Sequence, residues 1–274
     1  DNLINASEKS LDGIYKITGK RVKNYQVDLT DDKALANIFA ENTDIVGVVH
    51  FAALKAVGES VEKPLLYYRN NLIGLINLLD NMTRYNIPNL IFSSSCSVYG
   101  NTTELPVTEM TPKQEAESPY GRTKQMGEDI LWDLSKTNSS MNTILLRYFN
   151  PAGAHESAFI GESPANIASN LIPVITEAAA NKRPPLTVFG TDYPTRDGSC
   201  IRDYIHVMDL AHAHTLALQH LLSNKNEEKC TVFNLGIGKG VSVLEALSAF
   251  ERETHVRAPF TLGERRPGDV IEIY

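Results

Sequence analysis

Ser118-Pro119-Tyr120-Gly121-Arg122-Thr123-Lys124 is the stretch of this sequence that indicates both its fold and its chemistry. A serine followed by a proline is a typical helix start, and apolar residues follow at helical spacing. Tyr120 and Lys124 are therefore expected on one face of a helix. Upstream, residues 90–95 have the pattern of a strand that ends in three serines. Ligands bind at the carboxyl ends of strands in open α/β sheets, so Ser95 is predicted to lie near this pair.

The pair of Tyr120 and Lys124 suits the removal of a proton from an alcohol. A free phenol has a pKa of about 10, which is too high for a base at neutral pH unless a nearby cation stabilises the phenolate. Lys124 can supply that charge, and Ser95 can hydrogen-bond the alcohol or relay its proton. Chance alone gives about half a Tyr-x-x-x-Lys match in such a chain, which has 11 Tyr and 14 Lys. A surface pair is thus the alternative, and the serine-ended strand favours catalysis.

Four longer runs carry a more specific signal when they are taken together. They are residues 50–60, 92–95, 147–154 and 202–210. In this order they resemble the extended short-chain dehydrogenase/reductase superfamily and, within it, the UDP-glucose 4-epimerase family. The resemblance covers nearly the whole chain and includes the candidate catalytic residues Tyr120, Lys124 and Ser95.

The resemblance implies an α/β fold with two parts. The first is an NAD-binding, Rossmann-type, doubly wound parallel sheet in residues 1–149, to which residues 203–236 return. The second is a smaller α/β lobe that binds the UDP-sugar, in residues 150–274. The implied reaction interconverts UDP-glucose and UDP-galactose by transient oxidation at carbon 4 of the hexose, with NAD as a permanently bound cofactor.

The resemblance also assigns binding residues. The residues implied to bind NAD are Asp1, Asn2, Asp28, Leu29, Phe51, Lys55, Asn70, Lys124 and Tyr148. Those implied to bind the UDP-sugar are Ser95, Cys96, Ser97, Asn150, Ser169, Asn170, Leu171, Thr187, Val188, Phe189, Arg202, Arg266 and Asp269. From the sequence alone, Asp28 reads equally well as a turn or cap residue. Ile273 corresponds to a position that gates the sugar pocket, and its stiff, branched side chain predicts a preference for sugars without an N-acetyl group.

Two other functions fit the same scaffold. A nucleotide-sugar 4,6-dehydratase would carry a Thr-Asp-Glu run where this chain has Ser95, Cys96 and Ser97, so the acids needed for elimination are missing. A non-catalytic dinucleotide-binding protein would be expected to lose Tyr120 or Lys124. The sequence contains no Gly-x-x-Gly-x-x-Gly phosphate loop, so we expect a chain incomplete at its N-terminus and its extreme C-terminus that binds NAD weakly.

The composition limits the classes of binding partner and indicates the cellular compartment. The net charge of −7 and the lack of a basic run argue against nucleic acid and anionic membranes as partners. The three cysteines are odd in number and have no metal-ligand spacing, which predicts a reducing compartment and no metal site. No apolar run approaches the roughly 18 residues of a membrane span, so a cytoplasmic location is expected.

The expected elements follow from periodicity and capping signals. Strands are predicted over residues 22–29, 45–51, 142–149 and 231–236, and helices over residues 31–41, 203–222 and 241–253. The last helix has a capping box formed by Ser242 and Glu245. A long amphipathic helix over residues 64–85 is interrupted at Asn70, Asn71 and Gly74. With the helix that carries Tyr120, it resembles the pair that forms a four-helix homodimer interface.

Overall fold

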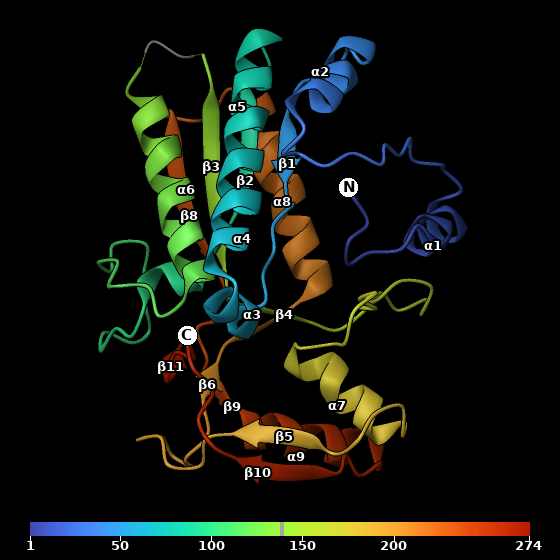
Figure 1. Cartoon of the computed structure of the whole chain (residues 1–274), viewed down its shortest axis with the longest axis vertical. Helices are drawn as coiled ribbons and strands as arrows, with labels where there is room; N and C mark the ends of the chain where they lie inside the picture. The colour runs from blue at the N-terminus through green and yellow to red at the C-terminus, as the bar shows by residue number, and fades with distance from the viewer. Residues whose placement is uncertain (138–139) are drawn as a thin grey trace.

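A four-stranded parallel sheet forms the centre of the computed structural model, which describes residues 1–137 and 140–274. In spatial order the strands are β1 (Val48–His50), β2 (Asn89–Ser95), β3 (Asn142–Tyr148) and β8 (Cys230–Leu235) (Figure 1). Each neighbouring pair is parallel, so all the carboxyl ends lie at one edge. The α/β fold and the parallel sheet predicted from the sequence are confirmed.

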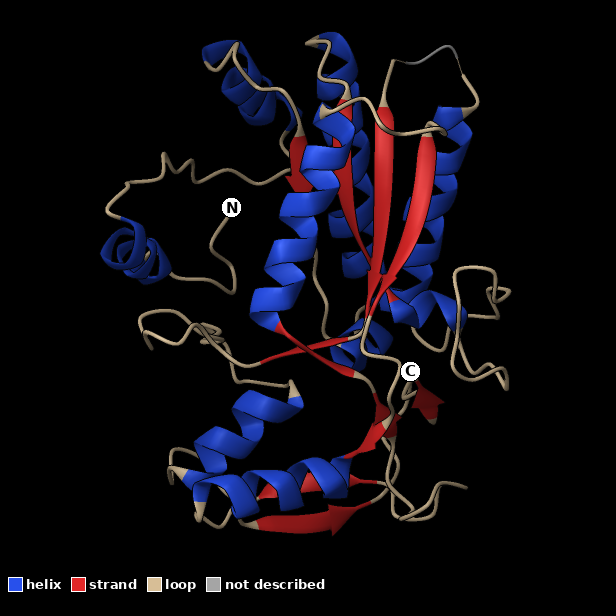
Figure 2. Cartoon of the chain, turned by 180° about the vertical axis from the view of Figure 1, so that it is seen from behind, coloured by secondary structure: helices blue, strands red, loops and turns tan. Residues whose placement is uncertain are grey.

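Helices cover both faces of this sheet because the strands are apolar on both sides. Leu90 and Leu145 pack with α2 (Asp32–Glu41), α5 (Gly74–Arg84) and α6 (Pro119–Ser135). Ile91 and Ile144 point the other way and pack against α8 (Val207–Leu222). Figure 2 shows α8 crossing the face opposite α5 and α6. The predicted helices over residues 31–41 and 119 onward are confirmed, and the helix predicted over 203–222 starts later, after strand β7 (Tyr204–His206).

The strand predicted over residues 22–29 is wrong. This segment is extended but belongs to no sheet, and its ladder-like hydrogen bonds are limited to Asp1. The Asp1 amino group donates to Tyr25 O, and Val27 N donates to Asp1 O, both at 3.1 Å. Periodicity predicts an extended chain, whereas a strand also needs a neighbouring strand that the described residues do not supply. The strand predicted over residues 45–51 is also shorter in the structure: only the three residues of β1, which pair with β2, form a strand.

The interruption predicted in the long helix over residues 64–85 is confirmed. The helix is divided into α4 (Pro64–Tyr68), a π-helical segment (Arg69–Ile73) and α5. Gly74 lies where a β-carbon would come within 3.2 Å of Leu29 Cβ. A π-helical turn is an unusual conformation that often occurs at functional sites. Before it, the chain forms the short helix α3 (Val57–Glu62).

The remaining elements form a smaller α/β unit below the central sheet in Figure 1. In this unit β5 (Leu186–Phe189) pairs with β10 (Phe260–Gly263), and α7 (Leu171–Ala179) and α9 (Val243–Thr254) pack on the pair. The capping box of Ser242 and Glu245 at the start of α9 is confirmed. Short strands link the unit to the sheet: β4 (Asn150–Ala152) with β7, and β6 (Ile201–Arg202) with β9 (Val241–Ser242) and β11 (Glu272–Ile273).

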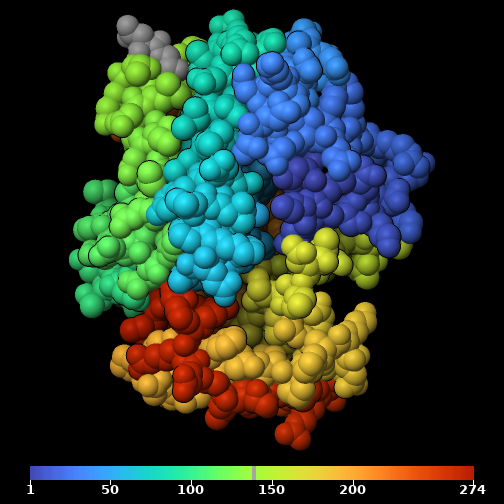
Figure 3. Space-filling view, viewed as in Figure 1, coloured from blue at the N-terminus to red at the C-terminus, as the bar shows by residue number. Residues whose placement is uncertain are grey.

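The N-terminal segment touches the segment that follows β4. Helix α1 (Lys9–Thr18) is close enough that a β-carbon on Gly13 would lie 2.5 Å from Ile160 Cγ2. The Lys55 ammonium pairs with Glu162 at 3.4 Å in the same region. In Figure 3 the dark-blue start of the chain lies beside this yellow segment. The two parts of the molecule therefore meet at the edge where the strands of the sheet end.

Candidate active site

The start of α6 is fixed against the end of β2. Ser118 caps the helix by accepting a hydrogen bond from Gly121 N at 3.2 Å, and Pro119 occupies the first turn. A β-carbon on Gly121 would lie 3.3 Å from Ser97 O, so glycine permits this close approach. Ser97 belongs to the 3₁₀ turn (Cys96–Tyr99) that follows β2. The helix start predicted from the sequence is confirmed, and it brings Tyr120 and Lys124 to the strand end.

Lys124 is buried, with only 6% of its surface exposed. Its ammonium group donates a 2.6 Å hydrogen bond to Ser93 O and lies 5.1 Å from the Phe92 ring centroid and 5.9 Å from that of Tyr120. Burial lowers the pKa of Lys124 to about 8, although the nearby carboxylate of Glu128 raises it. At neutral pH the side chain is therefore mostly charged, and its charge has little access to water.

Burial acts in the opposite direction on Tyr120, because the charged form of a phenol is the anion. Desolvation, and then Tyr148, raise the pKa of Tyr120 above its ordinary value, and the Ser95 hydroxyl lowers it in part. The charge of Lys124, 5.9 Å from the Tyr120 ring centroid, does not by itself offset this effect in the structure. The desolvation of Tyr120 is the stronger effect in this structure.

His50 is a buried neighbour that the sequence did not suggest. Its ring stacks on Phe92 with 5.8 Å between centroids. Desolvation, and then the charge of Lys124, lower the pKa of His50 to about 3. His50 is therefore neutral near pH 7, and Lys124 is the charged member of this pair.

Asn71 is a second residue that was missed. Its amide accepts from Leu54 N at 2.8 Å and donates both to Leu54 O and to Thr123 Oγ1 at 3.0 Å. Thr123 in turn donates to Tyr120 O at 2.7 Å. Asn71 thus joins the loop after β1 to the first turn of α6. In the sequence, the interruption of the apolar pattern at Asn70 and Asn71 indicates this site, but the resemblance assigns an NAD-binding role to Asn70 and none to Asn71.

The residues predicted to bind NAD surround the carboxyl edge of β1. Asn2 donates to the Asp28 carboxylate at 2.8 Å, and hydrogen bonds from Thr30 and then Asn2 lower the pKa of Asp28. Phe51 is 57% exposed, and Lys55 also has an exposed side chain. Asp1 contacts Tyr25, Leu29 O accepts from Asn77, and Asn70 donates to Asn71. The rings of Phe51 and Tyr148 both contact His214, with 4.6 and 5.9 Å between centroids. A carboxylate, a cation and a half-exposed ring are groups of the kind that fit the ribose, phosphate and ring portions of NAD.

Five of the predicted substrate residues converge from distant segments. Arg266 lies 5.6 Å above the Phe189 ring and pairs with the Asp269 carboxylate at 2.7 Å. Arg202 approaches the same carboxylate at 4.0 Å and lies near the Cys96 thiol, whose pKa its charge lowers against the larger effect of burial. This group connects the end of β2 to the smaller unit. The buried Ser97 Oγ has no hydrogen-bond partner among the described residues.

The other predicted substrate residues are not part of this group of contacts. The Val188 side chain is buried in the core formed by β5, α7 and α9, whereas its neighbours Thr187 and Phe189 are exposed. Asn170 donates to Glu162, the partner of Lys55. Asn150 starts β4, Leu171 starts α7, and Ser169 is exposed.

Ile273 is 2% exposed and packs with Cys96 and Phe149, beside its strand partner Arg202. Ile273 therefore lies next to Cys96 and Arg202, two of the residues predicted to bind the UDP-sugar. Among residues 1–137 and 140–274, no group of three or more acidic, His or Cys side chains could hold a metal ion.

We expect the variant Lys124→Met to be more stable than the parent at pH 7. Lysine titrates near 10.5 when unfolded and near 8 here, so between these values the unfolded chain binds more protons and stability rises with pH. Below pH 8 the penalty for burying the charge is fully present. Removing it should add up to about 3 kcal/mol to the free energy of unfolding at pH 7, less whatever the lost Ser93 hydrogen bond contributed.

Denaturant unfolding at pH 7 and pH 10 measures this effect. Lys136→Met is the matched control, because Lys136 is exposed, and it should change stability by less than about 0.5 kcal/mol. A Lys124→Met protein that is no more stable at pH 7 and keeps the parent's pH dependence would contradict the assignment of a buried charge.

Comparison with known proteins agrees with this geometry. The profile of the NAD dependent epimerase/dehydratase family matches residues 3–236. The chain is 50% identical to UDP-glucose 4-epimerase 2 of Arabidopsis thaliana and 47% identical to UDP-glucose 4-epimerase of Pasteurella multocida. Both alignments cover all of this chain, and they cover 78% and 80% of those proteins.

A similar structure is that of UDP-glucose 4-epimerase from Bifidobacterium longum in complex with NAD+ and UDP. Its TM-score is 0.96 at 45% identity, over all of this chain and 80% of that one. The NAD-binding, Rossmann-type fold and the resemblance found in the sequence are confirmed. This chain belongs to the NAD dependent epimerase/dehydratase family and, within it, to the UDP-glucose 4-epimerases.

Proposed function

We propose that this protein interconverts UDP-glucose and UDP-galactose by inverting carbon 4 of the hexose, and that NAD is its cofactor. The observation that carries the proposal is the buried group at the end of β2. Tyr120, Lys124 and Ser95 lie together there, on the fold of a UDP-glucose 4-epimerase.

In this reaction Tyr120 exchanges a proton with the hydroxyl group on carbon 4. When bound, NAD would supply the oxidation at carbon 4 and its reversal. Ser95 holds the substrate hydroxyl, and Lys124 keeps a cation beside the phenolate that forms. The 4-keto sugar that results can present either face, and Tyr120 returns the proton when the hydroxyl forms again. Burial prevents water from taking part in these transfers.

We assign the two binding functions to two parts of the chain. Residues 1–149, with residues 203–236, would hold NAD, and residues 150–274 would hold the UDP-sugar. The support for the second assignment is the group formed by Phe189, Arg202, Arg266 and Asp269. A planar ring suits a uracil base, and guanidinium groups suit a diphosphate.

We further propose a homodimer that buries α4, α5 and α6. Exposed apolar side chains on these helices and on the π-helical segment between α4 and α5 support it: Leu65, Leu66, Ile73, Ile76 and Met126. We expect sedimentation analysis to show a dimer that Leu65→Glu dissociates. Met110→Glu, at an equally exposed apolar residue elsewhere, should remain dimeric. A monomeric parent protein, or a dimer unaffected by Leu65→Glu, would contradict this interface.

A cytoplasmic location is also proposed. The three cysteines, Cys96, Cys200 and Cys230, are buried and unpaired, as is common in reducing compartments. No described helix is both long and apolar enough to cross a bilayer. Fluorescence microscopy of a tagged protein tests this location, and a signal confined to the secretory pathway would overturn it.

Tyr120→Phe is the direct test of the proposed reaction. It should lower kcat by about 10²–10⁴-fold and change the affinity for UDP-glucose by less than about threefold, because it removes the proton acceptor and keeps the binding groups. Tyr85→Phe, far from the site on α5's C-terminal side, is the matched control and should retain normal turnover. Near-normal turnover in Tyr120→Phe would exclude this residue as the base.

Ile273 is proposed to limit the substrate range. A 2-acetamido group that entered its space would meet a steric cost of about 1–3 kcal/mol, so kcat/KM should favour the unacetylated sugars about tenfold or more. Ile273→Ala should remove much of that preference. Val270→Ala, which thins the same apolar cluster, should keep it. Equal efficiencies in the parent enzyme, or no gain for acetylated sugars in Ile273→Ala, would show that another residue sets the range.

A further inference from the structure

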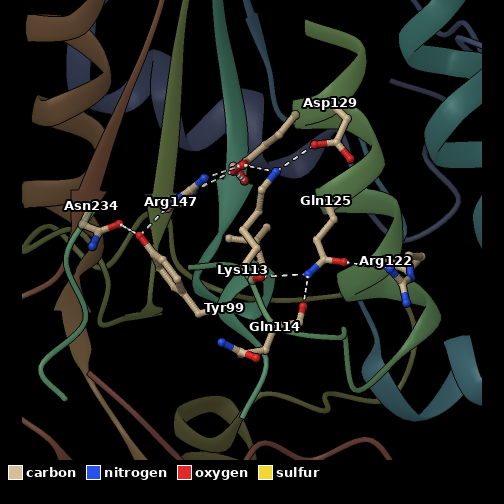
Figure 4. A network of polar contacts seen from close by, with 11 residues as sticks. Tyr99, Lys113, Gln114, Arg122, Gln125, Asp129, Arg147 and Asn234 are labelled. Carbon is tan, nitrogen blue, oxygen red and sulfur yellow. Dashed lines mark hydrogen bonds and ion pairs between the residues drawn. The ribbon is translucent and has the colours of Figure 1, made fainter. Parts of the chain in front are cut away.

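Glu128 lies one helical turn beyond Lys124 and is completely buried. Its carboxylate accepts hydrogen bonds from Ser94 Oγ at 2.5 Å and from Arg147 Nε and Nη2 at 2.8 and 2.6 Å. Lys113 approaches it at 3.4 Å from the loop before α6. Figure 4 shows Lys113 and Arg147 with the network that surrounds this carboxylate. An ion so deeply buried is stabilising only when its partners are well placed, so its geometry is tightly constrained.

The partners of Glu128 belong to adjacent strands at one level of the sheet. Ser94 of β2 and Arg147 of β3 are directly paired, and Arg147 is paired in turn with Asn234 of β8. Arg147 Nη1 also donates to Tyr99 OH at 3.0 Å, and Tyr99 OH donates to Asn234 Oδ1 at 2.6 Å. The network visible in Figure 4 therefore spans three strands and leaves little freedom in the position of α6.

The same helix face meets three consecutive residues of β2. Lys124 donates to Ser93 O, Glu128 accepts from Ser94 Oγ, and Tyr120 interacts with Ser95. A shift of α6 by one turn, about 5.4 Å, would separate all three contacts together. The Glu128 attachment thus determines where the tyrosine and the lysine lie relative to the strand end.

Glu128 also acts on Lys124 through its charge. The carboxylate opposes the desolvation that lowers the pKa of Lys124. The other ionisable groups near these two side chains are Tyr120 and Asp129 on α6, His50 on β1, Tyr99 after β2, Lys113 in the loop, Arg147 on β3 and Cys230 on β8. His50 and Cys230 are held neutral by burial. The exposed Asp129 pairs with Lys113 at 2.8 Å, so Glu128 is the buried anion beside Lys124 and Arg147.

We propose that Glu128 is a positioning residue of the active site: through Ser94 and Arg147 it fixes α6 on the sheet, and through its charge it keeps Lys124 protonated beside Tyr120. This inference deepens the proposed function, because the importance of a charged Lys124 rests on that reaction. The effect on Lys124 itself is a property of the folded chain and can be measured without substrate.

The decisive comparison is between Arg147→Met and the double variant Glu128→Gln/Arg147→Met. Neither contains an unpaired buried arginine, and in Arg147→Met the Glu128 carboxylate keeps Ser94 and Lys113 as partners, so the two proteins differ in the charge at residue 128. The pKa of Lys124 is measured by NMR of ¹⁵N-labelled lysine ammonium groups, with the signal assigned through Lys124→Met. In Arg147→Met the pKa should stay at or above about 8, and in the double variant it should be clearly lower. At pH 8 the protonated fraction of Lys124 should then be smaller in the double variant than in Arg147→Met.

Activity supplies the second measurement. The alkaline limb of the kcat–pH profile should move to lower pH in the double variant relative to Arg147→Met, while KM for the UDP-sugar changes by less than about twofold. Chemical denaturation of both proteins gives their stabilities, which a merely structural role would alter without moving the titration. Equal Lys124 pKa values in the two variants would overturn the proposal for Glu128. A shifted pKa with an unchanged kcat profile would instead contradict the role of Lys124 in the proposed reaction.

Discussion

The contact between one face of α6 and the carboxyl end of β2 is the constraint on which the rest of the site depends. Two ionisable side chains of the helix, Lys124 and Glu128, reach the strand across a dry interface, and each finds its partner there. Either group would be left with an unsatisfied buried charge if the helix moved, at a cost of several kcal/mol. Apolar packing alone would tolerate small displacements, whereas these two attachments allow one position of the helix.

Burial gives the site its electrostatic character. The same loss of water favours the neutral forms of His50, Tyr120 and Lys124, which lowers the pKa of the two bases and raises that of the phenol. Lys124 remains charged at neutral pH because it starts from a high pKa and has Glu128 nearby. One cation therefore lies 5.9 Å from the Tyr120 ring centroid in surroundings that screen charge weakly, but the desolvation of the phenol outweighs it.

Sequence reasoning succeeded where the determinants are local. The cap at Ser118, the capping box at Ser242 and the break in the helix around Asn71 are all encoded within a few residues. It failed for residues 22–29, where strand formation depends on pairing with a second strand. The periodicity of a sequence does not show whether such a neighbouring strand exists. It also missed the ion pair between Glu128 and Arg147. A single glutamate in a helix is normally expected on the solvent-exposed face, and only the fold brings the arginine 19 residues away next to it.

In the smaller unit, by contrast, the positive charges of two arginines are not fully balanced by carboxylates. Arg202 and Arg266 share one carboxylate, that of Asp269, so the pair is not neutralised. The neighbouring Asp203 cannot compensate, because its carboxylate is buried and directed at the backbone amides of Ile237 and Gly238, each at 2.8 Å. An excess positive charge thus remains beside the half-exposed Phe189 ring, over which Arg266 lies. The cations near the end of β2 have the buried carboxylate of Glu128 beside them, whereas the two arginines of the smaller unit share a single carboxylate.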